Sequence, residues 1–256
     1  MIKTKQAKNI TEQCVAPDGY IVVNVLSWHE HDTPYYDLCP YVLKTDGHEI
    51  QDNKGGVIFE NFWQGSKVYP IVKPIEVYPH HTFKGNKKYL WWSYDKEETH
   101  IDDNGDVKKE YFNWKKSLFD CAKPVRYPNS YALKHTCKFT LLVKKDGTQE
   151  KLNYLEARKQ LYCNEYMRLV RTKSSYKKLL NMLLEGKKLC IFEVDVPAVT
   201  KKGVHGKYAK DGNVFKASLK KINKLLNDTS EPFGHGLCLA KALLEDYQNA
   251  QLSDSD

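Results

Sequence analysis

The 256-residue sequence has no hydrophobic run that approaches the ~18 apolar residues needed to span a bilayer. Its first residues are rich in lysine and lack the apolar core of a secretory signal peptide. These two absences argue against a membrane-spanning or exported protein. We therefore expect a soluble protein of the cytoplasm.

Paired cysteines are also missing. The seven cysteines are odd in number and scattered, and none belongs to a C-x-x-C pair. This spacing argues against a disulfide framework and a zinc site, and it fits a reducing compartment. His29 and His31 flank Glu30 in a polar loop with no third ligand nearby, so we expect neither a metal nor a cofactor.

The chain lacks a histone-like basic tail, although basic residues are in excess. Forty lysine and arginine residues against thirty-two acidic ones give a formal net charge of +8. Such a charge attracts a polyanion such as nucleic acid, but a lysine-rich surface also serves solubility alone. The net charge does not decide between these two interpretations.

Hydrophobic residues make up 41% and aromatic residues 12% of the chain, which is enough for one large core. We expect one domain over residues 19–250, an N-terminal arm at 1–18 and a disordered tail at 251–256. Aromatic residues alternate with lysines between residues 70 and 128. This pattern suits a surface that stacks bases and neutralises phosphates, but it equally suits a subdomain core that buries Trp92 and Trp114.

Local patterns predict the main helices and strands. β-branched and apolar runs bounded by turn residues predict strands over 20–26, 41–45, 138–143 and 189–195. Apolar residues at three- and four-residue spacing predict helices over 152–170 and 175–185, with shorter helices from about 111, over 215–226 and from 233. Residues 102–106 are acidic but lack the terminal Glu of a calcium loop, so we expect a hairpin turn there.

One octapeptide, Glu60 to Lys67 (E-N-F-W-Q-G-S-K), carries an unusual combination of side chains. At about 100° per residue, Glu60, Trp63, Gln64 and Lys67 share one stripe of a helix, and Phe59, Phe62 and Tyr69 lie on the other side. The apolar side suits a core, and the polar stripe suits a binding site. The alternative is a solvated face whose polar residues only maintain solubility.

Three further segments are candidates for binding or catalysis. Arg126 and Tyr127 lie between Pro124 and Pro128, in a stiff segment that can hold the arginine toward an anion or serve as a connector. Asp195 is a carboxylate at the predicted end of a strand. Gly234, His235 and Gly236 open the last helix, where backbone N–H groups can cradle a phosphate. Residues 200–213 form a basic, glycine-containing loop that we expect to act as a flap.

Several of these segments together resemble the NADAR family of N-glycosidases. E-N-F-W-Q-G-S-K at 60–67 is similar to the family's E-H-Y-F-Q-A-Q-K helix, and Y-D-L-C-P-Y at 36–41 is similar to its D-F-S-N-F element. Residues 156–193 resemble its paired helices and L-V-E strand, and Gly234 to Gly236 resemble the glycine-rich entry to its last helix. The departures are Pro40 in place of an asparagine, the loss of a tryptophan–glycine pair, and apparent insertions near 70–128 and 196–231.

The resemblance implies a helix-rich α+β fold, a NADAR-like single domain with inserted segments. It also implies binding of an ADP-ribose or ribose-phosphate group and cleavage of its N-glycosidic bond. Some members resemble enzymes that reverse guanine ADP-ribosylation in nucleic acid, and phage genomes carry members of this kind. The extra basic and aromatic residues here suit ADP-ribosylated DNA, or less readily RNA, better than a free metabolite.

The resemblance also suggests a role for each candidate. Glu60, Lys67 and Asp195 are the expected catalytic residues, with Lys67 acting on the sugar as a cation or attacking C1″ as an amine. Asn61, Trp63, Gln64, Arg126, Tyr127, Gly234, His235 and Gly236 are expected to bind substrate. Two alternatives remain open: an N-glycosidase of a small phosphorylated metabolite such as a riboflavin-pathway intermediate, and a module that binds ADP-ribose or DNA without catalysis.

Overall fold

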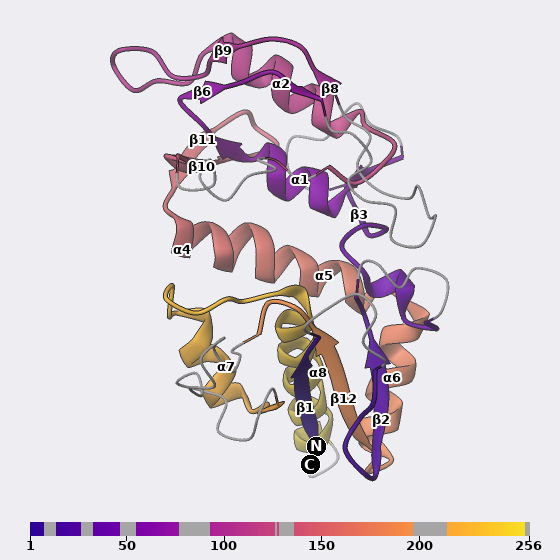
Figure 1. Ribbon diagram of the computed structural model, residues 1–256. Helices are drawn as coiled ribbons and strands as arrows, with labels where there is room; N and C mark the ends of the chain where they lie inside the picture. The colour runs from indigo at the N-terminus through magenta and orange to yellow at the C-terminus, as the bar shows by residue number, and fades with distance from the viewer. Residues whose placement is uncertain are drawn as a thin grey trace, which may run out of the picture. The chain divides into compact units, whose positions relative to one another are not determined.

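The computed structural model describes residues 1–7, 14–26, 33–46, 55–76, 93–125, 127, 136–196 and 214–253, without the side chains of residues 75, 76 and 93. The protein is a mixed α/β structure (Figure 1). It divides into two compact units. Unit 1 contains Met1–Cys39 and Cys163–Asp256, and unit 2 contains Pro40–Tyr162. Unit 1 is thus assembled from both ends of the chain.

A four-stranded sheet forms the centre of unit 1. Its strands are β1 (Ile2–Gln6), β2 (Tyr20–Asn24), β12 (Lys188–Glu193) and β13 (Val214–Lys216). They lie in the order β13-β1-β12-β2. β12 is parallel to both β1 and β2, and β13 is antiparallel to β1. The apolar run from Leu189 to Phe192 is buried, as a strand at the centre of a covered sheet requires.

Strand β1 lies inside the segment for which the sequence predicts an N-terminal arm. Ile2 and Thr4 alternate with lysines, and both are buried. Lys3 and Lys5 place their amines over the rings of Tyr20 and Phe192, at 4.4 and 5.6 Å from the ring centroids. The long apolar stems of lysine allow such a strand to pack while its composition remains polar. The predicted arm therefore contributes a strand to the central sheet of unit 1.

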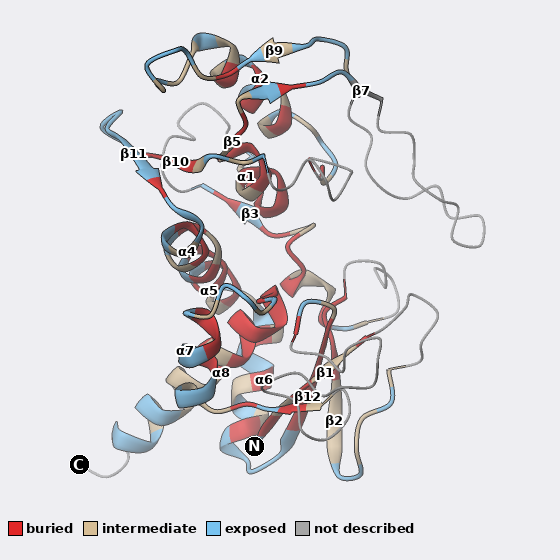
Figure 2. Ribbon diagram, turned by 60° about the vertical axis from the view of Figure 1, so that its left-hand side comes forward, coloured by how far each residue is buried: buried red, intermediate tan, exposed pale blue. Residues whose placement is uncertain are grey.

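Helices complete unit 1. They are the 3₁₀ turn Tyr36–Leu38, α5 (Glu165–Arg171), α6 (Ser174–Leu184), α7 (Leu219–Leu226) and α8 (His235–Ser253). α8 contacts α5, α6 and α7 as well as β1 and β12. Its first turns are buried and its last turns are exposed (Figure 2). Because α8 continues through Ser253, the first three residues of the predicted tail are helical.

The described part of unit 2 contains short strands and three helices, of which α1 and α2 pack together. Its strands are β3 (Lys44–Thr45), β4 (Val57–Ile58), β5 (Lys67–Val68), β6 (Ile71–Val72), β7 (Ile75–Glu76), β8 (Ser93–Tyr94), β9 (Glu98–Thr99), β10 (Phe139–Val143) and β11 (Gln149–Leu152). Its helices are α1 (Phe59–Gly65), α2 (Lys109–Phe119) and α4 (Tyr154–Ala157). The π-helical stretch Arg158–Asn164 then leads toward α5.

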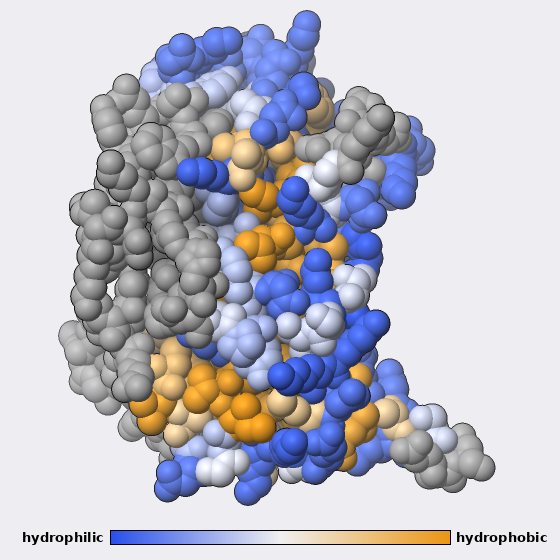
Figure 3. Space-filling view, turned by 90° about the vertical axis from the view of Figure 1, so that its right-hand side faces the viewer, coloured by the Kyte–Doolittle hydropathy of each residue, from blue (hydrophilic) through white to orange (hydrophobic). Residues whose placement is uncertain are grey.

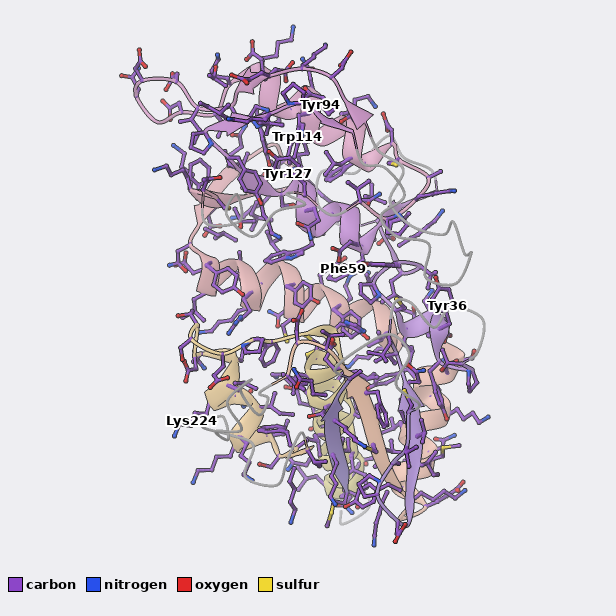
Figure 4. All side chains as sticks on the ribbon, in the orientation of Figure 1. Tyr36, Phe59, Tyr94, Trp114, Tyr127 and Lys224 are labelled. Atoms are coloured by element: carbon purple, nitrogen blue, oxygen red, sulfur yellow. The ribbon has the colours of Figure 1, made fainter. Side chains whose placement is uncertain are left out.

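The core of unit 2 is aromatic. Trp114 of α2 is fully buried and packs edge-on against Tyr127, with ring centroids 5.4 Å apart (Figure 4). Val68, Tyr69, Val72, Tyr111 and Leu141 belong to the same cluster. The core interpretation is therefore confirmed for Trp114, and Trp92 lies outside the described residues.

Most predicted elements are confirmed, with shifts at their ends. The strand expected over 41–45 is reduced to Lys44–Thr45, and residues 215–226 divide into the last residues of β13 and helix α7. The hairpin turn at 102–106 is confirmed, since Asp102 Oδ1 accepts hydrogen bonds from the backbone N–H groups of Asn104 and Asp106.

Large hydrophobic residues are rarely exposed. Those in the described part of the chain are separated along the sequence: Met1, Val15, Ile71, Tyr154, Leu184 and Leu252. The face in Figure 3 shows hydrophobic areas with hydrophilic ones around them. Among the described helices, none combines the length and the apolar character needed to cross a membrane.

Candidate active site

Backbone hydrogen bonds from a neighbouring segment fix the start of helix α1. At its start, the N–H groups of Phe59 and Glu60 donate to the carbonyl oxygens of Leu43 and Pro40, at 2.8 and 3.1 Å. These bonds satisfy two of the amides that a helix leaves unpaired at its N-terminus. The helix ends at Gly65, so the prediction of a helix through Lys67 is wrong by two residues. Lys67 opens strand β5 instead and lies opposite Thr140 of β10.

Three polar side chains of this segment form a hydrogen-bonded chain. Gln64 Nε2 donates to Glu60 Oε1 at 2.7 Å, and Lys67 Nζ donates to Gln64 Oε1 at 2.7 Å. The carboxylate needs a donor and the amine needs an acceptor, so the two neighbours fix the orientation of the amide. The side-chain amide of Gln64 thereby connects the carboxylate of Glu60 to the amine of Lys67.

This chain is largely removed from water. Glu60 is 7% exposed and Gln64 is 6% exposed, whereas Lys67 is half-buried. The solvated-face alternative is therefore wrong for Glu60 and Gln64. A buried carboxylate is costly unless it is hydrogen-bonded, which is why the amide of Gln64 matters to the fold as well as to any chemistry.

An aromatic surface adjoins Lys67. Its Nζ lies 4.7 Å from the centroid of the Trp63 ring, a cation–π distance. Trp63 in turn contacts Tyr162, with ring centroids 5.0 Å apart. The predicted apolar side of the helix is confirmed, because Phe59 and Phe62 are buried.

Asn61 has a different environment from its helix neighbours. It is fully buried, and its Nδ2 donates to the carbonyl oxygens of Cys121 and Lys123 at 3.2 and 2.9 Å. Its Oδ1 accepts from the N–H of Val125 at 2.6 Å. Asn61 thus fixes the 121–125 segment, and this arrangement corrects its predicted role as a substrate-binding residue.

The proline-flanked segment contributes less than the sequence predicts. The ring of Tyr127 is 3% exposed and packs against Tyr69 and Trp114, so it belongs to the core and not to a binding surface. Burial raises the pKa of Tyr127, which keeps its hydroxyl neutral. Arg126, the predicted anion ligand, lies outside the described residues, as do His29, His31 and the basic loop at 200–213.

A second group of predicted residues lies in unit 1, around a carboxylate that the sequence analysis did not select. β12 ends at Glu193 and not at Asp195, and Asp195 is exposed. Glu193 is 2% exposed. Its Oε1 accepts from the N–H groups of Val194 and Asp195, and its Oε2 accepts from the N–H of Gly236 at 2.6 Å.

Glu193 also pairs with His235. His235 Nδ1 lies 2.9 Å from Glu193 Oε2, and His235 Nε2 lies 2.8 Å from the carbonyl oxygen of Val25. Since both partners only accept hydrogen bonds, both ring nitrogens must carry protons, and His235 is an imidazolium. Burial alone would lower the pKa of His235, but the carboxylate of Glu193 raises it. Burial alone would raise the pKa of Glu193, but His235 and the N–H groups of Gly236 and Asp195 lower it.

The glycines around His235 accommodate this ion pair. A Cβ atom at Gly234 would lie 2.5 Å from the carboxyl carbon of Glu193, and one at Gly236 would lie 2.8 Å from its Cβ. The Gly234 N–H donates to the carbonyl oxygen of Asp195 at 2.8 Å. The predicted pyrophosphate cradle is corrected accordingly, because the anion at the start of α8 is the protein's own Glu193. Glycines flanking a histidine, after a strand that ends in Glu, are the signal that could have indicated this arrangement.

The predicted residues thus fall into two groups. Glu60, Trp63, Gln64 and Lys67 come together in unit 2, and Asp195, Gly234, His235 and Gly236 come together in unit 1. The first group combines a carboxylate and an amine that one amide joins, whereas in the second group the carboxylate of Glu193 pairs with His235. Within the described ranges, no three His, Cys, Asp or Glu side chains are arranged to hold a metal ion.

Comparison with known proteins adds no assignment to this geometry. No family model, no curated protein and no solved structure shows significant similarity to the chain.

Proposed function

We propose that the protein is an N-glycosidase that hydrolyses the ribose–nitrogen bond of ADP-ribosylated bases, guanine in particular, in DNA. The observation that carries the proposal is the hydrogen-bonded chain of Glu60, Gln64 and Lys67, in which one amide orients a carboxylate and an amine. Such an activity would reverse DNA ADP-ribosylation. The NADAR-like sequence features of residues 60–67 support the same reaction class.

The chemistry needs the groups that α1 and β5 supply. Breaking the C1″–nitrogen bond develops positive charge on the ribose, and a fixed carboxylate beside the ring stabilises that charge. Glu60 takes this role and accepts a proton from the water whose oxygen bonds to C1″. Lys67 donates a proton to the base as the C1″–nitrogen bond breaks. Gln64 holds both groups, and the Trp63 ring offers a stacking surface for a base.

The first test is release of free ADP-ribose from ADP-ribosylated duplex DNA by the purified protein. Glu60→Gln keeps the size of the side chain and removes its charge, so we expect kcat to fall by about a hundredfold or more with binding retained. Glu97→Gln is the matched control, because Glu97 is an exposed carboxylate of the same unit. Release at an unchanged rate by the Glu60→Gln protein would overturn the proposal.

The same assay separates the other functions. Turnover of a phosphorylated riboflavin-pathway intermediate, with none of modified DNA, would favour a metabolite N-glycosidase. Tight binding of ADP-ribose without turnover of either substrate would favour a non-catalytic module. Borohydride trapping during turnover reports on Lys67: a covalent adduct at this residue would replace its role as proton donor by that of a nucleophile.

A further inference from the structure

Helix α7 in unit 1 divides cleanly into two faces. Ile222, Leu225 and Leu226 are buried, at 0, 0 and 7% exposure. All the polar residues of α7 are exposed to solvent: Lys220, Lys221, Asn223 and Lys224. Lys216 of β13, just before the helix, is exposed as well. Lys224 is seen projecting from α7 in Figure 4. We call these four lysines the α7 basic face.

Among the described residues, the four amines of the α7 basic face take part in no hydrogen bond or ion pair, and α7 itself contains no acidic residue. Lys220 and Lys224 are four residues apart on one side of the helix, where like charges repel and lower helix stability. Lys220 lies in the first turn of α7, where the helix dipole favours a glutamate over a lysine, so helix stability does not account for this lysine.

We propose that the α7 basic face binds the sugar–phosphate backbone of nucleic acid. The inference rests on the proposed function for the identity of the substrate, and it adds the surface that would hold the DNA. Lysine and asparagine are among the side chains that donate hydrogen bonds to phosphate oxygens, and such contacts carry no sequence information. The helix of eight residues is about 12 Å long, enough for a few phosphates.

The same geometry argues against other anionic partners. A helix that binds a membrane surface presents an apolar face to the lipid, but the apolar residues of α7 are buried in unit 1. A protein interface of useful affinity needs aromatic or aliphatic anchors at its centre, and the exposed side of α7 offers only lysine and asparagine. Nucleic acid is the polyanion that requires neither.

The test measures the affinity of the full chain for a short, unmodified, fluorescein-labelled DNA duplex by anisotropy over a series of salt concentrations. If Lys220 and Lys224 each neutralise one phosphate, the double variant K220Q/K224Q reduces the magnitude of the log K against log[salt] slope by about 1.8, or 0.9 per charge. Affinity at low salt falls by about tenfold or more.

The matched control is K177Q/K178Q. Lys177 and Lys178 are exposed on α6 of the same unit, so this variant removes the same charge from another surface. We expect its slope to equal that of the wild type. Equal losses of DNA affinity in K220Q/K224Q and K177Q/K178Q would overturn the inference, because the net charge of the protein would then explain binding. The inference would also be overturned if the K220Q/K224Q variant lost binding to anionic lipid vesicles but bound DNA as the wild type does.

Failure here is distinct from failure of the proposed function. The binding assay uses unmodified DNA and needs no turnover. Lysine-dependent binding without release of ADP-ribose from modified DNA would contradict only the proposed hydrolysis. Release of ADP-ribose with binding that is indifferent to Lys220 and Lys224 would contradict only the role of the α7 basic face.

Discussion

Asn61 illustrates how the environment of one residue decides its role. The helical pattern places it next to Glu60, where an amide would suit a ribose, yet its three hydrogen bonds all go to the backbone of residues 121–125. Two of these bonds are donated and one is accepted. Only a side-chain amide of this length offers both kinds of group at this position.

This requirement makes Asn61→Asp a sharp test. The carboxylate would face the carbonyl oxygens of Cys121 and Lys123, so buried like partial charges would replace two hydrogen bonds. We expect the free energy of unfolding in urea to fall by about 3–5 kcal/mol, and by a smaller 2–3 kcal/mol or so for Asn61→Ala. Asn113→Asp, at an exposed position of α2 in the same unit, should change it by less than about 0.5 kcal/mol. Equal effects at positions 61 and 113 would mean that Asn61 does not hold this segment.

At the scale of elements, α1 and α2 pack closely because α1 ends in glycine. A Cβ atom at Gly65 would lie 2.9 Å from Cε1 of the Phe119 ring, and the Gly65 carbonyl oxygen accepts from the hydroxyl of Tyr111 at 2.9 Å. The glycine therefore fixes how near α2 approaches the end of α1 that carries Gln64.

Gly65→Ala should therefore destabilise the protein, although alanine favours an isolated helix by about 1 kcal/mol. Overpacking against the ring is expected to cost about 1–3 kcal/mol, measured as a lower urea midpoint with an unchanged m-value. In a Phe119→Leu background the ring is gone, so the same substitution should cost less. A stabilising Gly65→Ala in the wild-type background would show that the helices can separate without penalty.

Sequence patterns predict elements of this structure better than they predict contacts. The strand at 139–143 and the helix at 174–184 follow from local alternation and apolar spacing. β1 was missed because its lysines pack through their stems against Tyr20 and Phe192, which no local pattern reveals. Pairing of β1 with β12 joins residues nearly two hundred positions apart, so the assembly of unit 1 from both chain ends was not predictable either.

The candidate site shows the same division. Spacing placed Glu60 and Gln64 together because helical geometry is local, and the structure confirms their contact. The roles of Tyr127 and Gly236 depend on contacts with Trp114 and Glu193, which lie in other elements of the fold, and sequence alone assigned these roles wrongly. A glycine needed for a phosphate and a glycine needed for an internal carboxylate look identical in a sequence.

At the scale of the whole molecule, each unit buries a histidine, but the two histidines are in opposite protonation states. His235 of unit 1 is an imidazolium paired with Glu193, and its pKa is raised. His100 of unit 2 is fully buried beside Tyr111 and Trp114, and neither ring nitrogen has a hydrogen-bond partner within the described residues. Burial lowers the pKa of His100 to about 4, although Glu98 lies 3.9 Å away.

The raised pKa of His235 makes the fold less stable as the pH rises, and the lowered pKa of His100 makes it less stable as the pH falls. The contribution of His235 is fully present below its ordinary pKa of 6.5 and is lost as the pH rises through its raised pKa. The contribution of neutral His100 is present above 6.5 and is lost as the pH falls toward about 4, because the unfolded chain then binds a proton that the folded unit excludes. Glu193 adds a loss only at still lower pH, below the ordinary carboxyl value of 4.5.

We therefore expect the melting temperature to be highest near pH 6.5 and to fall on both sides, with a different histidine responsible for each side. His100→Leu removes the group that titrates in unit 2, so the melting temperature of this variant should change less than that of the wild type between about pH 6.5 and 4. Glu193→Gln leaves His235 without its counter-ion, at a cost of about 3–5 kcal/mol, and should flatten the decline above pH 6.5. Scanning calorimetry of the wild type and both variants across this range tests the assignment. If His100→Leu altered the alkaline side, or Glu193→Gln left that side as steep as before, the two histidines would not be the groups that set the pH dependence.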